Sequence, residues 1–294
     1  MSTKEFSLGR TPRSNSAVAM TITATLLAGC ATAPMTRGGS LSSYDSMAPS
    51  DGVLTKSLVR VSTDEILAAK TVRLVPTGFA ATASPALTET QRALVANAID
   101  RSLCVGLSER FEVVSPGEPA DLTMRAVVTQ AAATDEVAVG ASKVVSIVPA
   151  ALGVSVPVPR LPLGLGSLTV EAEAQDKTGK QQAAMLWARG ADSFTTAATV
   201  SKAGDAYDLA TTFGGDMSRL LITGSSPFGK LPAAPSLEKL GSSLGAKPKY
   251  AACEAFGPSP GVIGMISSRI GLPPEWSDKG APTAKTPLTA RATD

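Results

Sequence analysis

The amino-acid sequence predicts an α+β fold, in which a mixed or antiparallel sheet carries two amphipathic helices on one face. Two segments, 88–110 and the stretch that begins at Asp205, repeat apolar residues at the spacing of a helix with one buried side. Shorter segments alternate apolar and polar residues, as half-buried strands do. Irregular segments are expected on both sides of this domain, a small-residue tether before it and a Pro/Gly-rich tail after it.

The first 29 residues have the organisation of a secretory signal peptide. Lys4, Arg10 and Arg13 precede an uncharged apolar run, and small residues lead from this run to Cys30. The apolar run is too short to cross a bilayer, which takes about 20 apolar residues. We therefore expect residues 1–29 to direct export and to be removed.

The end of this signal sequence, Leu27-Ala28-Gly29-Cys30, resembles the lipobox of bacterial lipoproteins. The resemblance implies cleavage before Cys30, a diacylglycerol on its thiol and an acyl chain on its new amine. Several acyl chains hold a protein on a membrane far more firmly than one chain does. Ala31 is not the Asp that resembles an inner-membrane retention signal, which favours the outer membrane, facing the periplasm. An ordinary signal peptide with an incidental cysteine is the alternative.

Residues 30–52 are small and polar, and this composition is typical of a flexible tether between a lipid and a folded domain. The α+β domain is expected over 53–224. Its first part, 53–70, has no decisive pattern, whereas 71–75 alternates and stops at Pro76, as a strand would.

The clearest helix is predicted over 88–110. Thr88 and Gln91 have the spacing of a capping box. An apolar stripe follows at helical spacing, formed by Leu94, Val95, Ala98, Ile99, Leu103 and Leu107. Cys104 lies next to this stripe.

Four strands are predicted after this helix. Residues 111–114 form a short strand, and 120–130 alternate as a half-buried strand does. Residues 168–174 and 181–189 form a hairpin, because 176–180 supply an Asp- and Gly-containing turn.

The second helix begins at Asp205 and ends before Gly224, a residue typical of the position just after a helix. One side of it carries Leu209, Phe213, Met217, Leu220 and Leu221. The tail, 225–294, holds ten of the 21 prolines and is not expected to form a second core. Part of it, 253–276, could dock on the domain through Phe256, Val262, Ile263, Met265, Ile266 and Trp276.

An uncharged segment, 144–159, interrupts the domain and contains Pro149, Pro157 and Pro159. Its length and its prolines exclude a membrane-spanning helix. It is either a crossover that packs on the core or a surface that meets another subunit or the membrane interface. In the second case the interface residues are Val145, Ile147, Leu152 and Val154.

The two cysteines that remain after lipidation, Cys104 and Cys253, could form a disulfide in the oxidising periplasm. Such a bond would fix the tail to the middle of the domain. Two unconnected thiols are the alternative, because the sequence gives no distance between these residues.

Taken together, the lipobox, the opening Leu41-Ser42-Ser43-Tyr44-Asp45, the hairpin turn at 176–179 and the closing amphipathic helix resemble one uncharacterised family of Gram-negative lipoproteins. The resemblance covers about residues 40–222. It implies the location and the type of fold, and it supplies no catalytic residues.

Composition excludes several classes of function. Without residues 1–29 the chain has 24 Lys+Arg and 24 Asp+Glu, so it lacks the basic excess that nucleic-acid binding needs. The chain has no histidine, which excludes Ser-His-Asp and Cys-His catalysis and His-ligated zinc. Asp205, Asp208 and Asp216 lie near one another on the second helix, where we expect a solvated face rather than a metal site.

The sequence therefore favours a non-enzymatic outer-membrane lipoprotein that acts as an accessory or interaction subunit of an envelope assembly. It would need no cofactor or metal, and its partners would be the membrane, through the lipid at Cys30, and another envelope protein or a second copy of the chain. One alternative is a protein that binds a lipid or another apolar small molecule between its helices and sheet. A hydrolase of envelope polymers is a third class, which the absence of histidine disfavours.

Overall fold

The computed structural model describes residues 33–140, 163–196, 198–229, 240–242 and 244–282. In this part of the chain eight strands form one mixed sheet, in the order β1-β2-β8-β7-β6-β3-β5, with β4 also paired to β6. The strands are β1 (Ala48–Pro49), β2 (Thr55–Val61), β3 (Thr71–Leu74), β4 (Gly78–Phe79), β5 (Glu112–Val114), β6 (Leu122–Ala132), β7 (Ser167–Asp176) and β8 (Gln181–Gly190). The expected α+β class is confirmed.

The centre of the sheet is antiparallel. Strand β7 pairs with β6 on one side and with β8 on the other, so that Ala172 lies opposite Ala126 and Met185. The predicted hairpin joins β7 to β8, and the side chain of Asp176 accepts hydrogen bonds from the backbone N–H groups of Thr178 and Lys180 in its turn. Strands β3, β4 and β5 add parallel pairings at the β6 side.

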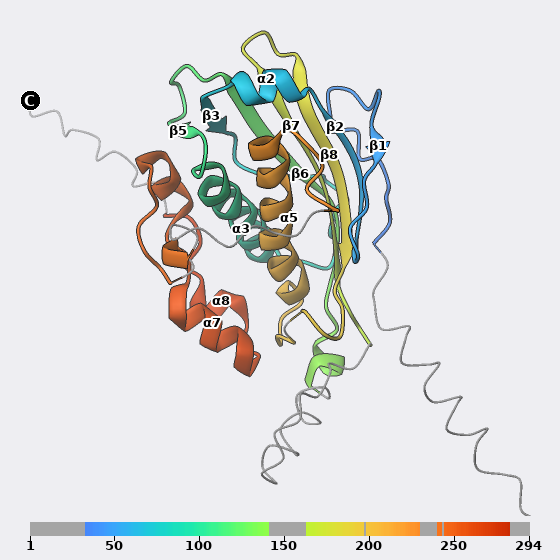
Figure 1. Cartoon of the computed structure of the whole chain (residues 1–294). Coiled ribbons are helices and arrows are strands. Elements are labelled where there is room, and N and C mark those ends of the chain that lie inside the picture. The colour runs from blue at the N-terminus through green and yellow to red at the C-terminus, as the bar shows by residue number, and fades with distance from the viewer. Residues whose placement is uncertain (1–32, 141–162, 197, 230–239, 243, 283–294) are drawn as a thin grey trace, which may run out of the picture.

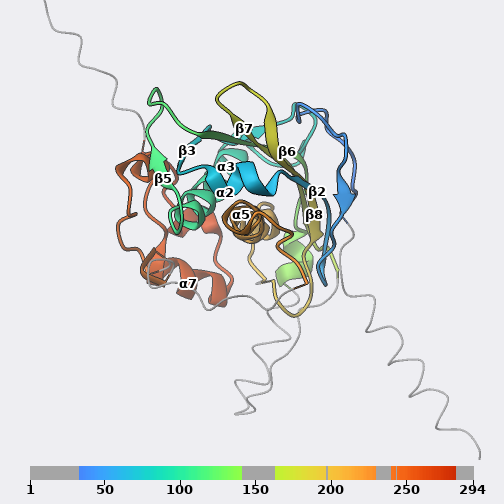
Figure 2. The ribbon, with the colours of Figure 1, turned by 45° about the horizontal axis from the view of Figure 1, so that its top comes forward.

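Three helices lie on one face of the sheet: α2 (Thr63–Ala68), α3 (Glu89–Leu107) and α5 (Gly204–Thr223) (Figures 1 and 2). Helix α3 begins with the predicted capping box, in which the Thr88 hydroxyl accepts from the Gln91 N–H and the Gln91 side chain accepts from the Thr88 N–H. Helix α5 ends at Gly224, which adopts a left-handed conformation with φ of 59°. Both long helices lie where the sequence predicted them.

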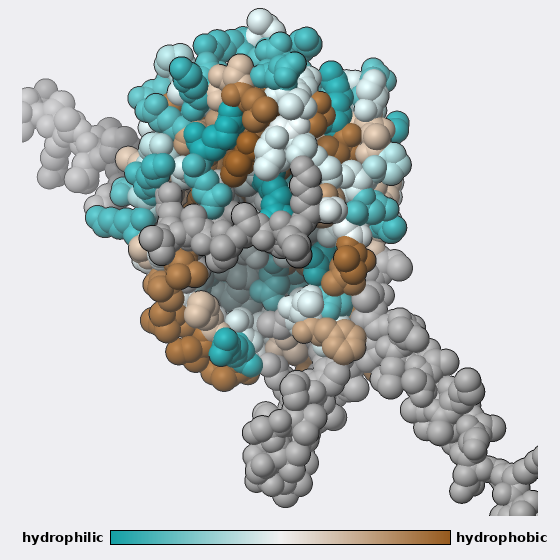
Figure 3. Space-filling model, viewed as in Figure 1, coloured by the Kyte–Doolittle hydropathy of each residue, from teal (hydrophilic) through white to brown (hydrophobic). Residues whose placement is uncertain are grey.

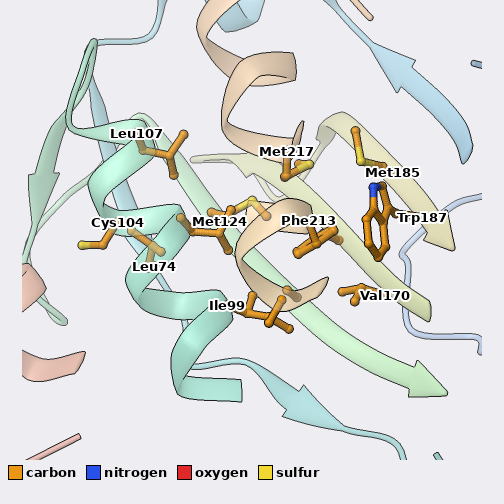
Figure 4. Close-up of a cluster of buried hydrophobic side chains, with 14 of the residues drawn as sticks. Leu74, Ile99, Cys104, Leu107, Met124, Val170, Met185, Trp187, Phe213 and Met217 are labelled. Atoms are coloured by element: carbon orange, nitrogen blue, oxygen red, sulfur yellow. The ribbon is translucent and has the colours of Figure 1, made fainter. Parts of the chain in front are cut away.

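The core fills the space between these helices and the sheet (Figure 4). The rings of Trp187 on β8 and Phe213 on α5 meet edge to face, with centroids 5.6 Å apart. Met185, Met217 and Ile99 are fully buried around them. This is the place where the alternative hypothesis expected an apolar ligand, and the chain's own side chains occupy it.

Two elements, β2 and α2, fall in the region 53–70, which has no decisive pattern in the sequence. The first inward-facing positions of β2 are Thr55 and Ser57, which are buried but polar. An apolar alternation is therefore absent from the start of this strand. Among the described residues no helix has the length and apolar character needed to cross a membrane.

Candidate functional site

The face of β7 that points away from the helices carries three polar residues. Val170 and Ala172 belong to the core, so Thr169, Glu171 and Glu173 lie on the opposite face. Both glutamates are nonetheless buried. The N-terminal segment, defined here as Pro34–Asp45, covers them, and it runs along the outside of the sheet in Figure 2.

In the described part of the chain, the hydrogen bonds to the Glu171 carboxylate all come from the N-terminal segment. The carboxylate accepts from the backbone N–H of Gly38 at 2.7 Å and from the backbone N–H and hydroxyl of Ser40 at 2.9 and 2.5 Å. The Tyr44 hydroxyl donates to the same carboxylate at 2.7 Å. Burial and this hydrogen bond raise the pKa of Tyr44. Both oxygens of Glu171 are therefore engaged by the chain itself.

Glu173, two residues further along β7, is held both by the N-terminal segment and by side chains of the neighbouring strands. It accepts from the backbone N–H and hydroxyl of Ser42 at 2.8 and 2.7 Å, from Gln181 Nε2 at 2.7 Å and from Arg125 Nε at 2.6 Å. Burial raises the pKa of Glu173, but the hydrogen bonds from Ser42 and Gln181 and the charge of Arg125 outweigh it, so the net pKa is lowered. The carboxylate stays ionised and fixes the segment.

These contacts explain the opening motif Leu41-Ser42-Ser43-Tyr44-Asp45. Leu41 is buried, and Ser42 and Tyr44 bind the two glutamates. The segment has little regular structure, as expected, but it is bound to the sheet rather than free of it. The sequence did not indicate this, because the alternation of β7 makes Glu171 and Glu173 resemble solvent-facing residues.

The C-terminal segment, defined here as Tyr250–Gly280, docks on the outer side of the helix layer. It contains η2 (Ala251–Phe256), α7 (Gly261–Ile270) and α8 (Pro274–Ser277). A disulfide joins Cys253 of η2 to Cys104 of α3, with their Cα atoms 5.8 Å apart. Asn97 Nδ2 donates to the carbonyl of Phe256 at 2.9 Å. The predicted disulfide is confirmed.

An ion pair also attaches the C-terminal segment to α3. Arg101 on α3 binds both carboxylate oxygens of Asp278, and the Tyr207 hydroxyl donates to Asp278 Oδ2 at 2.6 Å. Burial raises the pKa of Asp278, but Arg101 outweighs it and the net pKa is lowered. Burial also raises the pKa of Tyr207, and the negative charge of Asp278 adds to this. All three groups act to hold the segment in place.

Two adjoining cavities lie between α5 and the C-terminal segment. One, of about 360 Å³, is lined by α5, α7 and α8, and the other, of about 400 Å³, lies between α3, α5 and the start of α7. They share Tyr207, Thr211, Ser259 and Pro260. The first also has Met265 and Leu272 in its wall, which is mainly apolar and includes several hydroxyl-bearing residues.

Helix α7 exposes its apolar side chains. Phe256 of the expected docked element is buried, but Val262, Ile263, Met265 and Ile266 are exposed, as is Trp276 of α8. In Figure 3 an apolar surface appears at the position of α7.

The expectation of a solvated face for the aspartates of α5 is wrong at two of the three positions. Asp205 is fully buried, and its carboxylate accepts from the backbone N–H of Gly166 at 2.7 Å. Asp216 accepts from Trp187 Nε1 at 2.8 Å, and burial raises its pKa. Asp208 is half-buried beside the first cavity. Within the described ranges no cluster of His, Cys, Asp and Glu could hold a metal ion.

Two groups of predicted residues lie outside the described part of the chain. One is the lipobox, Leu27, Ala28, Gly29 and Cys30. The other is the proposed interface, Val145, Ile147, Leu152 and Val154. Both remain predictions from sequence.

The chain belongs to a protein family described as "Protein of unknown function (DUF3313)", whose model matches residues 36–217. The match includes the N-terminal segment from residue 36 on, the whole sheet and α3, and it ends within α5. An uncharacterised family was expected from the sequence. The C-terminal segment lies outside the match.

Among solved structures the chain is similar to two PelC dodecamers from Paraburkholderia phytofirmans. One has 11% sequence identity and a TM-score of 0.31, covering 57% of this chain and 97% of that chain. The other has 9% identity and a TM-score of 0.33, covering 58% of this chain and 98% of that chain. At these values the similarity is distant. No curated protein matches the sequence.

Proposed function

We propose that this protein is a lipoprotein of a Gram-negative bacterium, anchored in the outer membrane through Cys30 and facing the periplasm. There it acts without catalysis, as an accessory or interaction subunit of an envelope assembly. The observation that carries the proposal is the sequence Leu27-Ala28-Gly29-Cys30 after a basic and then apolar leader.

The way in which the N-terminal segment is bound supports this anchoring. Gly38 is fixed to Glu171 and lies eight residues after Cys30. Eight residues reach at most about 29 Å. A lipid on Cys30 would therefore hold the folded domain close to the bilayer, and the contacts of Glu171 and Glu173 would transmit that attachment to the sheet.

The use of the buried polar groups supports an interaction role. The carboxylates of Glu171 and Glu173 bind the N-terminal segment, and that of Asp278 attaches the C-terminal segment to Arg101 of α3. Helix α7, in turn, exposes apolar side chains to solvent. Surfaces of this kind mark contact sites rather than centres of acid–base chemistry.

The lipid anchor is tested by following incorporation of labelled palmitate and membrane association in cells. The test variant has Cys30→Ala together with an ordinary cleavable signal peptide in place of residues 1–29, so that processing still occurs. We expect loss of the label and release into the periplasm. Ala31→Asp is the matched control, which keeps the label and moves the protein to the inner membrane. A Cys30→Ala protein that stays in the outer membrane would contradict the proposal.

A second candidate function is the binding of an apolar small molecule. The cavity of about 360 Å³ between α5 and α7 favours it, because its wall includes Met265, Leu272 and Pro274. Native mass spectrometry of the unlipidated Cys30→Ala protein tests this function. A species heavier than the chain by the mass of a small molecule supports it, and the mass of the chain alone argues against it.

A further inference from the structure

Helix α7 buries its small residues and exposes its apolar ones, the reverse of an ordinary docked helix. Its buried residues are Gly261 and Ser267, whereas Ile263, Ile266 and Ile270 are 71%, 55% and 62% exposed. An amphipathic helix that only stabilises a fold turns its apolar side to the core. The apolar side of α7 is therefore available to something outside the domain.

Backbone hydrogen bonds place α7 at one end of the sheet, where β6 and β8 finish and β7 begins. The Val200 N–H donates to the carbonyl of Gly271, the residue after α7, at 2.9 Å. In the same region the Thr134 N–H donates to the Lys202 carbonyl, and the Asp135 N–H donates to the Gly164 carbonyl. The C-terminal end of α7 therefore lies beside the loop that follows β8, and that loop lies beside the segment that follows β6.

These loops also expose apolar side chains. We define the apolar end by eight residues that are each at least 40% exposed: Val137, Leu163, Phe194, Val200, Ile263, Met265, Ile266 and Ile270. They come from four separate parts of the chain. Exposed apolar residues gathered from distant segments at one end of a molecule indicate a contact surface.

The N-terminal segment leaves the sheet at this same end. Thr169, close to the start of β7, donates through its hydroxyl to the carbonyl of Pro34 at 3.1 Å. Pro34 lies four residues after Cys30, and four residues reach at most about 14 Å. A lipid on Cys30 is therefore restricted to the end of the sheet at which the apolar end lies.

We propose that the apolar end lies against the bilayer and that α7 enters its interfacial region. The inference rests on the proposed lipid anchor at Cys30, whose place beside this end is what favours a membrane over a protein partner. The composition of α7 fits insertion, because it contains no acidic residue and Arg269 is its one charged residue. The helix would then add a second attachment to that of the acyl chains and fix the orientation of the domain.

The test uses the unlipidated Cys30→Ala protein, so that only the folded surface can bind. Flotation with vesicles of phosphatidylethanolamine and phosphatidylglycerol measures the bound fraction. We expect Ile263→Glu with Ile266→Glu to lower the partition coefficient at least about tenfold, because two charges would have to enter the interface. Leu67→Glu, on α2 at the opposite end and 45% exposed in the parent, is the matched control and should bind within about twofold of the parent.

The fluorescence of the two tryptophans of the chain provides a second readout. Trp276 is exposed on α8 beside α7, and Trp187 is buried in the core. In the lipidated protein we expect vesicles with brominated acyl chains to quench Trp276 and to leave Trp187 unchanged. Removal of Trp276 by Trp276→Phe should abolish the quenching.

Three results would overturn the inference: equal flotation of the α7 variant and the parent, no flotation of the parent, or no quenching of Trp276 in the lipidated protein. Loss of a copurifying protein in the α7 variant, with vesicle binding unchanged, would assign the surface to a protein partner instead. Failure of the lipid anchor is detected separately, because palmitate labelling depends on Cys30 and not on α7.

Discussion

Asp100 lies on α3, and its carboxyl group is buried. The carboxyl group binds Thr77, which follows strand β3. It accepts from the backbone N–H of Thr77 at 2.9 Å and from the Thr77 hydroxyl at 2.5 Å. Burial raises its pKa to about 6, against an ordinary value of 3.8, and the hydrogen bonds from Thr77 oppose this rise only in part. The group therefore titrates in a range that solution experiments reach easily.

The pH dependence of stability follows from this raised pKa. The stabilisation associated with protonated Asp100 is fully present below about pH 4 and is lost as the pH rises through about 6. The displacement from 3.8 to about 6 corresponds to about 3 kcal/mol. We expect Asp100→Asn to gain about that much stability relative to the parent between pH 4 and pH 7, measured by urea unfolding. Parallel stability curves for the two proteins would contradict this.

At the residue scale the sequence predicts burial well for the apolar sides of α3 and α5, but not for the apolar residues of α7 or for polar side chains. The stripe of α3 and the apolar side of α5 were predicted residue by residue, and they are buried. Glu171, Glu173 and Asp205 were not, because periodicity identifies the face on which a residue lies but not what covers that face. Their partners, Ser42 and Gly166 among them, are distant in sequence.

At the scale of elements, α3 and α5 pack closely through small residues. A Cβ on Gly106 would overlap the side chain of Ser218, and one on Gly214 would overlap that of Ser102. On each helix, therefore, a glycine packs against a serine of the other helix. The apolar spacing predicted both helices. It did not predict this contact, because a glycine within a helix does not by itself indicate which residue packs against it.

The disulfide is the covalent link between the C-terminal segment and α3. It closes a loop with a sequence separation of 149 residues between Cys104 and Cys253. Closing a loop of this length lowers the entropy of the unfolded chain and stabilises the fold by roughly 2–5 kcal/mol.

We expect Cys104→Ser with Cys253→Ser to lower the free energy of unfolding by roughly 2–5 kcal/mol, measured by urea denaturation. The loss should equal that caused by reducing the parent protein, because both remove the same bond. Equal stability of the parent and the double variant would contradict a stabilising role for the disulfide.

At the scale of the whole molecule, the domain has a layered arrangement. The N-terminal segment covers one face of the sheet, α3 and α5 cover the other, and the C-terminal segment covers the helices from outside (Figure 2). Local patterns predicted the two central layers, because sheet and helix each have a period. They did not predict that the N-terminal segment binds the sheet through contacts such as Glu171 with Tyr44. The docking of the C-terminal segment and its disulfide were expected, but the ion pair of Arg101 with Asp278 was not.

The central claim is that this chain is a lipid-anchored interaction subunit rather than an enzyme or a carrier of small molecules. The most direct measurement is native mass spectrometry of the lipidated protein after extraction in mild detergent. We predict a defined multiple of the acylated chain, or a complex of the chain with a second protein. A lone monomer that carries small-molecule mass beyond its acyl chains would contradict the claim and favour the ligand-binding alternative.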